Sequence, residues 1–492
     1  MVWAIFLHIY QPPDQRPEIL EKIVNESYRP LIKGFLANPR TRLTLNITAC
    51  LTELLVDSGF GDVIEGFGKL AKNGQLEFTG SAAYHPFLPL LPKREIARQI
   101  KLNEVVNRKY FGQAWPRSAN RQGFFPPEMG YDAKVGEVVS ELGYDWIILD
   151  EIAFNGKMDT VDYSKIGKVS SLPLKIVFRE RRTSNLIMGA MVRTVESVAE
   201  ALSSELNKKR YLVTAMDGET FGHHRPGFEN FLFALFRQAP PAGGFKFIKI
   251  SELIKSFPLD GEISPIPSCW ASSEEEISKG EPFYLYFRQK NKLHVLLKSL
   301  LDLAIKVGGS PVRGGGQTRI LLDRAQSCNS FWWANPDAWW SIEEIELGAF
   351  NLWQVVEKSK TAGRAEKKRA RQLYQEIVFL AFSWQRQGLV RKLHAQKQAW
   401  IKIPFKKRAK SGEYEAIIEI LKKELEKAIS RQEFEQVIRW RDSIYKLEHG
   451  LDIYSLVHIV DQLRAEGRLG EYAKLTEKYK ERYKKIVSGQ PE

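Results

Sequence analysis

The sequence has few cysteines and no long apolar run. Its 492 residues include only three cysteines, Cys50, Cys269 and Cys328, which are isolated and lack metal-ligand spacing. We therefore expect no disulfide framework, and this cysteine usage fits a reducing compartment. No stretch approaches the roughly 18 consecutive apolar residues of a membrane span. The apolar start, Met-Val-Trp-Ala-Ile-Phe-Leu-His, lacks the basic residues of a signal peptide. A cytoplasmic protein without membrane attachment is expected.

Positive charge is unevenly spread along the chain. The net charge is +14, and nearly all of the excess lies in residues 351–410. A basic stripe of this kind can bind nucleic acid or another polyanion. It can equally be a solvated helix face followed by a basic linker. No aromatic residues are interleaved at a spacing that suggests base stacking, so nucleic acid is not an expected partner.

The first half of the chain alternates strand and helix patterns. Such repeated units imply parallel strands with right-handed crossovers. Seven or eight of them in roughly 260 residues favour a closed α/β barrel over an open sheet. Amphipathic helices are predicted between several strands, for example over 18–36 and 94–110. The predicted strands are Val2–His8, Arg42–Thr48, Gln75–Thr79, Gly123–Phe125, Trp146–Leu149, Leu174–Phe178, Tyr211–Met216 and Phe245–Ile248.

The second half is almost wholly helical in pattern. A chain of this length should form two or three domains, and a Pro- and Ser-rich stretch near 263–270 is a plausible exit from the barrel. A Gly-rich segment, 308–316, predicts a flexible loop within the helices. The expected parts are a barrel at 1–262, a helical domain at 263–401, a basic linker at 402–412, a helical hairpin at 413–449 and a helical tail at 450–492.

Two carboxylates stand where predicted strands end. Glu128 follows the strand at Gly123, and Asp217 follows the strand at Tyr211. In an α/β barrel the carboxyl ends of the strands form the catalytic face, and two carboxylates there suffice for glycoside cleavage. Alternatives remain: Asp217 could cap the following turn, and Glu128 could be a surface loop acid.

Other polar and aromatic groups accompany this pair. His8 closes the first strand, Glu77 lies in the third, and tryptophans crowd into Phe331–Trp340. Flat apolar rings suit carbohydrate binding, although tryptophan also fills helical cores. Strand-end Asp and His also mark zinc-dependent deacetylases. However, His223 and His224 are adjacent, and no His pair has helical spacing, so no metal is expected.

Five segments together carry a family resemblance over roughly residues 1–400. The run His8-Ile-Tyr-Gln-Pro-Pro13 resembles the first motif of glycoside hydrolase family 57, with Tyr10 in place of its second His. The segments that look like the later motifs are Gly74–Gly80, Phe125–Tyr131, Ala215–His223 and, in the helical domain, Gln326–Trp333.

The resemblance implies a fold, a reaction and residue roles. The fold is a (β/α)7 barrel followed by a helical domain that completes the cleft. The reaction is retaining cleavage or transfer on α-linked glucans, of amylase, 4-α-glucanotransferase or branching type, without a cofactor. Glu128 becomes the nucleophile and Asp217 the acid/base, whose pKa a neighbouring carboxylate should raise. The implied substrate-binding residues are His8, Tyr10, Gln11, Glu77, His85, His223, Trp270, Trp332 and Trp333.

A rival interpretation belongs to a different class of protein. In it, a degenerate barrel binds polysaccharide without catalysis, and the C-terminal part recruits partners. Tyr10 favours that alternative, whereas the retained Glu128 and Asp217 pair favours an enzyme.

The C-terminal part carries a second resemblance. Residues 421–447, with Phe434-Glu435 and Arg441-Asp442, resemble the UVR helical hairpin of nucleotide-excision repair proteins and some protease adaptors. Two short amphipathic helices bury little apolar area alone. The resemblance implies a protein partner or self-association through 413–449; the alternative is an ordinary hairpin packed on its own domain.

Overall fold

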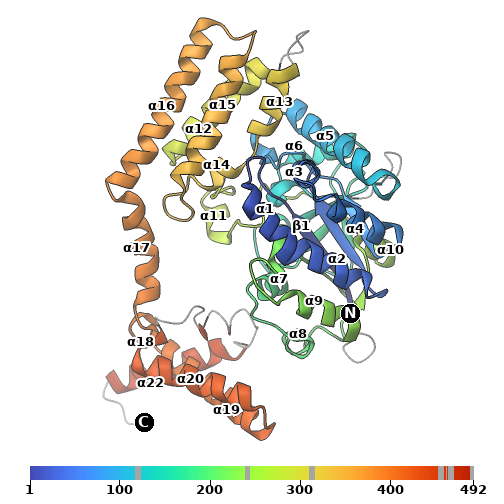
Figure 1. The fold of residues 1–492 in the computed structure, drawn as a ribbon. Coiled ribbons are helices and arrows are strands. Elements are labelled where there is room, and N and C mark those ends of the chain that lie inside the picture. The colour runs from blue at the N-terminus through green and yellow to red at the C-terminus, as the bar shows by residue number, and fades with distance from the viewer. Residues whose placement is uncertain are drawn as a thin grey trace. The chain divides into compact units, whose positions relative to one another are not determined.

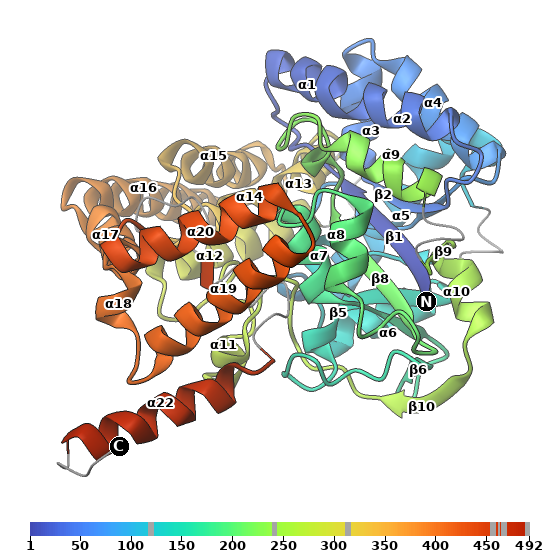
Figure 2. The same ribbon diagram turned by 90° about the horizontal axis from the view of Figure 1, so that it is seen from below.

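The computed structural model describes residues 1–116, 123–238, 244–309, 316–452, 459–460, 463 and 470–487. The chain separates into two compact units, Met1–Gln387 and Gly388–Glu492. In the first unit, an α/β region with parallel strands is followed by a helical region (Figures 1 and 2). This order confirms the fold class in outline, and the finer domain boundaries stay predictions.

One five-stranded sheet is built around a buried central strand, β1. Its apolar residues lie on both faces because parallel strands are covered on both sides. The strand order is β3-β2-β1-β8, with β9 pairing to the start of β1, and every pairing is parallel. The strands are β1 (Val2–Ile9), β2 (Leu43–Ile47), β3 (Leu76–Thr79), β8 (Tyr211–Asp217) and β9 (Lys246–Phe247).

A second five-stranded sheet has the order β10-β6-β7-β5-β4. Only the β6–β7 pairing in it is antiparallel. Eight strands were expected, and all eight are present; β6 and β10 were not expected. The strands are β4 (Gly123–Phe124), β5 (Trp146–Asp150), β6 (Ile166–Val169), β7 (Lys175–Arg179) and β10 (Leu259–Ile263).

Backbone hydrogen bonds join the two sheets at both sides. Between β3 and β4, the Gly80 N–H donates to Gly123 O at 2.9 Å, and Phe125 N–H donates to Gly80 O at 2.9 Å. Between β7 and β8, the Glu180 N–H donates to Val213 O at 2.8 Å. The carboxyl ends of β4, β7 and β8 therefore face one region.

Helices connect and cover these strands. The helix expected over 18–36 is a continuous run of α1, the π-helical turn η1 (Val24–Tyr28) and α2. Helix α5 matches the helix expected over 94–110. Side-chain caps begin several helices, as Asp132 does for α6 by accepting from the Val135 N–H. The α-helices are α1 (Pro17–Ile23), α2 (Arg29–Leu36), α3 (Ala49–Asp57), α4 (Gly61–Lys72), α5 (Lys93–Phe111), α6 (Ala133–Glu141), α7 (Arg181–Met188), α8 (Val195–Ala201), α9 (Glu229–Gln238) and α10 (Ile250–Ser256).

The helical region of the first unit packs α12, α15 and α16 together. Their buried Leu, Ile, Val and Ala side chains belong to the same apolar core as β5 and β7. The predicted flexible loop at 308–316 falls mostly outside the described residues. The helices are α11 (Glu274–Ser278), α12 (Lys292–Gly308), α13 (Gly316–Ala325), α14 (Asn329–Trp332), α15 (Ile342–Lys358) and α16 (Arg364–Arg386).

The second unit contains the expected hairpin with its own core. Trp440 and Leu447 are buried against α19 residues such as Ile417. Gln432, at the turn, has a left-handed backbone with φ 57°. The stretch expected as a linker instead contains a short helix whose Phe405 is buried. The helices are α17 (Leu389–Lys402), α18 (Phe405–Arg408), α19 (Glu413–Ser430), α20 (Phe434–His449) and α22 (Tyr472–Val487); the rest of the expected tail lies largely outside the described residues.

Among the described residues, no helix combines the length and the apolar character needed to cross a membrane.

Candidate active site

Glu128 is held rigidly just beyond β4. It lies in the 3-10 turn η5 (Pro127–Met129) with a left-handed backbone, φ 61°. Its Oε2 accepts a hydrogen bond from Trp270 Nε1 at 2.7 Å, and its backbone oxygen accepts from the Trp270 N–H. Its side chain is only 16% exposed. Burial raises the pKa of Glu128 to about 7 and the charge of Asp217 adds to this, while hydrogen bonds from Tyr286 and Trp270 lower it.

Asp217 ends β8 and stands opposite His8 of β1 in the strand register. Its side chain makes no capping hydrogen bond to the turn that follows, so the helix-cap interpretation is wrong. Burial raises the pKa of Asp217 to about 6, and the positive charge of Arg179 opposes this rise. The raised pKa was expected, but burial causes it rather than the neighbouring carboxylate.

Both carboxylates line one cavity of about 630 Å³. That volume lies within the ordinary range for ligand sites. Aromatic rings and two arginines form much of its wall, and the helical region of the same unit contributes part of it. The residues are Tyr10, His85, Glu128, Arg179, Arg181, Asn185, Met188, Ala215, Met216, Asp217, Trp270, Ala271, Tyr286, Cys328, Asn329, Trp332 and Trp339.

A stack of rings supports the cavity wall beside Glu128. The His85 ring stacks on Tyr10 with centroids 4.0 Å apart, and His85 Nε2 lies 3.0 Å from His8 Nε2. His8 is buried behind this wall, and burial lowers its pKa to about 4, so it is neutral. The Tyr10 hydroxyl donates to Asn329 Oδ1 at 3.2 Å and lies 3.1 Å from Ser327 Oγ. Tyr10 therefore ties the loop after β1 to the helical region.

Four of the nine predicted substrate-binding residues line the cavity, namely Tyr10, His85, Trp270 and Trp332. His8, Gln11, Glu77, His223 and Trp333 do not.

Glu77 and His223, like His8 and Gln11, have structural partners instead. Glu77 lies early in β3, and its Oε1 accepts from Thr44 Oγ1 at 2.8 Å and from the Ser251 N–H of α10 at 3.1 Å. It therefore secures α10 and does not line the cavity, and its sugar-binding role stays a prediction. His223 Nδ1 lies 2.7 Å from Glu26 Oε2, which fixes the loop after β8 to the helix before α2.

Several residues of the site were not identified from the sequence. Arg179 ends β7 and donates to Ala215 O at 2.8 Å and to Asp150 Oδ2 at 2.6 Å. The sequence feature that could have identified Arg179 is its position at a strand end, as for Asp217. Glu219 Oε1 accepts from Gln11 Nε2 at 3.1 Å and from the Tyr28 hydroxyl, so it positions the loop after β1. For Trp339 the signal was the tryptophan cluster at Phe331–Trp340. No simple pattern distinguishes Arg181 or Tyr286.

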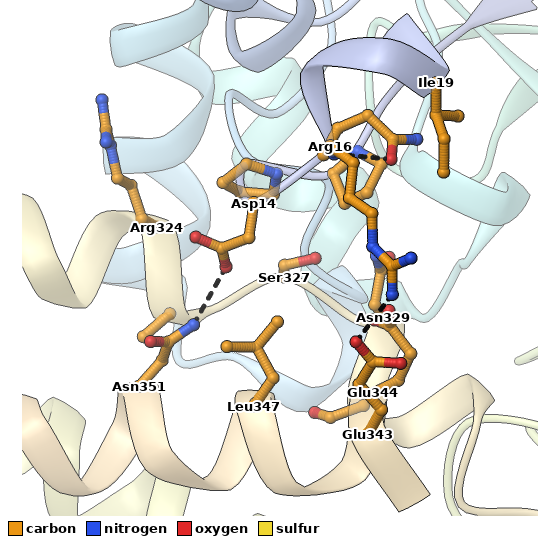
Figure 3. Close-up of a pocket in the computed structure, with 16 residues that line it drawn as sticks. Asp14, Arg16, Ile19, Arg324, Ser327, Asn329, Glu343, Glu344, Leu347 and Asn351 are labelled. Carbon is orange, nitrogen blue, oxygen red and sulfur yellow. Dashed lines mark hydrogen bonds and ion pairs between the residues drawn. The ribbon is translucent and has the colours of Figure 1, made fainter. Parts of the chain in front are cut away.

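A second cavity of about 290 Å³ shares Asn329 with the first as a lining residue. Figure 3 shows Asp14 hydrogen-bonded to Asn351 of α15 (3.1 Å) and Arg16 paired with Glu343 (2.8 Å). No aromatic side chain and no pair of strand-end carboxylates lines it. The larger cavity is therefore the better candidate for sugar chemistry.

Three groups in the larger cavity could approach a single metal ion. Potential ligand atoms of His85, Glu128 and Cys328 lie within 4.8 Å of one another. Burial raises the pKa of the Cys328 thiol well above its ordinary value. Because a metal binds the thiolate, this protonated thiol is a poor ligand.

Comparisons with known proteins agree on one family. The family model described as Glycosyl hydrolase family 57 matches residues 6–265. An alpha-amylase 1 from Dictyoglomus thermophilum is 26% identical over 153 residues, which cover 31% of this chain and 21% of that protein. A 4-alpha-glucanotransferase from Thermococcus litoralis is 24% identical over 148 residues, covering 30% of this chain and 21% of that protein. The matched segment thus spans about a fifth of the length of these curated relatives.

Solved structures share the fold. The crystal structure of the 4-alpha-glucanotransferase from Thermococcus litoralis aligns with a TM-score of 0.60 at 17% identity, covering 73% of this chain and 60% of that one. A GH57 branching enzyme from Thermococcus kodakaraensis aligns with a TM-score of 0.59 at 13% identity, covering 77% of this chain and 95% of that one. Since the family model covers more than half of the chain and the fold agrees, the protein belongs to glycosyl hydrolase family 57.

Proposed function

We propose that this chain cleaves or transfers α-linked glucans by a retaining mechanism, with Glu128 as nucleophile and Asp217 as general acid/base. One observation carries this proposal: both carboxylates line a single cavity with aromatic walls. The family relatives that the chain resembles include an alpha-amylase and a 4-alpha-glucanotransferase. The substrate class is taken from them, and hydrolysis, transfer and branching remain the candidate reactions.

The contacts of the two carboxylates fit these separate roles. Hydrogen bonds from Trp270 and Tyr286 stabilise the ionised form of Glu128, which must attack the anomeric carbon. Asp217 makes no side-chain hydrogen bond with the described residues, so its proton is available to the glycosidic oxygen. As the Glu128–carbon bond forms, the departing sugar takes that proton. Asp217 then removes a proton from water or a sugar hydroxyl, which attacks the same carbon and frees Glu128.

We also infer that β1, β2, β3, β4, β5, β7 and β8 form one irregular seven-stranded barrel. The inter-sheet hydrogen bonds from Gly80 to Gly123 and from Glu180 to Val213 support closure at both sides. In such a barrel the carboxyl strand ends meet at one face, which explains why residues from β4, β7 and β8 share a cavity.

A non-catalytic polysaccharide-binding role is the second candidate, and the replacement of a family histidine by Tyr10 favours it. The test is incubation of the purified chain with maltooligosaccharides and amylose, followed by chromatography of the products. New shorter or longer chains support the enzyme and separate hydrolysis from transfer. Binding without any product supports the second candidate.

The indole N–H of Trp270 should tune the pH dependence of turnover. In Trp270→Phe, Glu128 loses a donor that stabilises its carboxylate, so its pKa rises further. Because the pKa of Glu128 lies above that of Asp217, the alkaline limb of kcat/KM follows Glu128. That limb should move up by about one pH unit, and the maximum of kcat/KM should fall because less Glu128 is ionised while Asp217 is still protonated. The measurement is a pH profile of kcat/KM. The control is Trp339→Phe, which changes another aromatic residue of the cavity wall and should alter KM without moving that limb; equal profiles for both variants contradict the prediction.

The hairpin at 413–449 resembles a UVR module, and we propose it as a docking or self-association surface. Phe434, Ile438 and Tyr445 share one face of α20 and are 72%, 50% and 54% exposed. Exposed apolar side chains that gather on one helix face are a feature of contact surfaces. The three free cysteines, all buried, agree with a reducing, cytoplasmic setting for such contacts.

Self-association should depend on the exposed face of α20. We expect the full chain to exceed the monomer mass at micromolar concentrations, and Phe434→Ser to raise the dissociation constant about tenfold or more. Light scattering across a dilution series measures this. Phe379→Ser, which removes a comparably exposed ring from α16 (76% exposed), is the matched control. A monomeric wild-type chain at all concentrations rules out self-association and leaves a different partner.

A further inference from the structure

Three carboxylates converge outside the catalytic pair, beside β5 and β7. Glu151 directly follows β5, Glu180 directly follows β7, and Asp159 lies in the loop after Glu151. One oxygen from each lies within 4.8 Å of the others. Ligands on one Ca²⁺ sit about 2.3–2.6 Å from it, so their mutual separation cannot exceed about 5 Å. The spacing therefore suits a single ion.

Two of the arginines near these carboxylates pair with another acid. Arg181 and Arg179 both direct their guanidinium groups at Asp150, with contacts of 2.6 Å. Arg182 Nε is 3.6 Å from Glu180 Oε1. Backbone N–H groups donate to Glu151 and Glu180, but each carboxylate oxygen keeps a lone pair. The side chain of Asp159 makes no hydrogen bond or ion pair with the described residues.

Two buried hydroxyls give an independent indication of a ligand. The Tyr163 side chain is 7% exposed and Thr183 is 1% exposed, and neither hydroxyl has a hydrogen-bond partner among the residues that the structure describes. The charges of Glu151 and Glu180 both act on the Tyr163 phenol, and the Thr183 N–H already donates to Glu180 Oε2 at 2.7 Å. Buried hydroxyls are rarely left unpaired. Water molecules in the shell of a bound cation would satisfy both.

We propose that Glu151, Asp159 and Glu180 form a binding site for a hard divalent cation of the calcium type. Carboxylate oxygens, in a loop that can adjust its geometry, suit Ca²⁺ better than Mg²⁺, which demands a near-ideal octahedron. The site adjoins Asp150, whose carboxylate holds Arg179 and Arg181 in the cavity wall. A bound cation would therefore fix the loops after β5 and β7 and, through them, one side of the cleft.

The test is to treat the full chain with a chelator and then to measure its binding of Ca²⁺ by calorimetry and by Tb³⁺ luminescence. We expect one site in this region with a dissociation constant of about 10⁻⁶ to 10⁻³ M. Saturating Ca²⁺ should raise the melting temperature by about 2 °C or more. Asp159→Asn should weaken binding at least tenfold, and because Asp159 is exposed and makes no side-chain contact, this variant should fold normally. Glu151→Gln should abolish binding.

The matched control is Asp162→Asn, which removes a carboxylate from the same loop. Asp162 Oδ1 instead accepts from the Ser164 N–H at 3.0 Å and from Ser164 Oγ at 2.7 Å. Unchanged affinity in this variant, with loss in Asp159→Asn, supports the site. Absence of binding by the wild-type chain, or equal weakening in both variants, overturns it. These readouts do not depend on glucan turnover.

Discussion

Replacing Glu128 by Gln should lower turnover of maltooligosaccharides by about 10⁴-fold or more while glucan binding persists. The amide has nearly the shape of the carboxylate, and its oxygen can still accept the Trp270 hydrogen bond. It cannot form the glycosyl ester, so the covalent step is lost. Chromatography of products measures turnover, and calorimetry with the same oligosaccharides measures binding.

Stability provides an internal check on this variant. The pKa of Glu128 is raised from an ordinary 4.5 to about 7. Ionisation of this buried carboxyl therefore lowers the stability of the folded chain as the pH rises from 4.5 to 7, and the loss is complete above 7. The variant does not incur this cost, so its melting temperature relative to wild type should increase over that pH window. Glu137→Gln is the control: Glu137 lies on α6 and pairs with Lys93 at the surface. It should keep full turnover; a Glu128 variant that also keeps it refutes the nucleophile role.

Functional residues at strand ends could be predicted because the pattern that marks them, a polar residue directly after an apolar run, is local in the sequence. Asp217 and Glu128 each follow an apolar run, and the placement of one beside β8 and the other beyond β4 agrees with that pattern. β10 was missed for the opposite reason: its residues, Leu-Asp-Gly-Glu-Ile, are mostly exposed and carry no alternating apolar signal. β6 is short and contains Gly167 and Lys168, so its signal was equally weak.

The direction in which each side chain points could not be predicted from the sequence. Glu77 lies in a strand of the same sheet as Asp217, yet it stands near the start of β3 and bonds to α10 rather than facing the cavity. Arg179 and Tyr286 reach the site through contacts between segments far apart in the sequence. Motif order could not reveal such contacts, because they depend on how the helical region packs on the strands.

The pH dependence of wild-type turnover should be bell-shaped with its maximum near pH 6–7. Productive attack needs one carboxyl ionised and the other protonated. Burial raises the pKa of Glu128 to about 7 and that of Asp217 to about 6. The pair therefore holds one proton across this window, mainly on Glu128, and the form that reacts, with the proton on Asp217, is the minor one. Asp217→Asn removes the group that must stay protonated, so the alkaline limb should vanish. The acid limb that remains should report the ionisation of Glu128 alone.

Turnover of unactivated glucans by Asp217→Asn should fall about 10²- to 10⁴-fold. An aryl maltooligosaccharide with a good leaving group should lose far less in its first step, because that departure needs no proton donor. Azide should then restore turnover, since it attacks the glycosyl–Glu128 intermediate without a general base. Two inversions at the anomeric carbon give an α-glycosyl azide, which proton NMR identifies. If Asp217 were the nucleophile instead, azide would react by a single inversion and yield the β anomer. The configuration of one product therefore distinguishes the two assignments of these carboxylates.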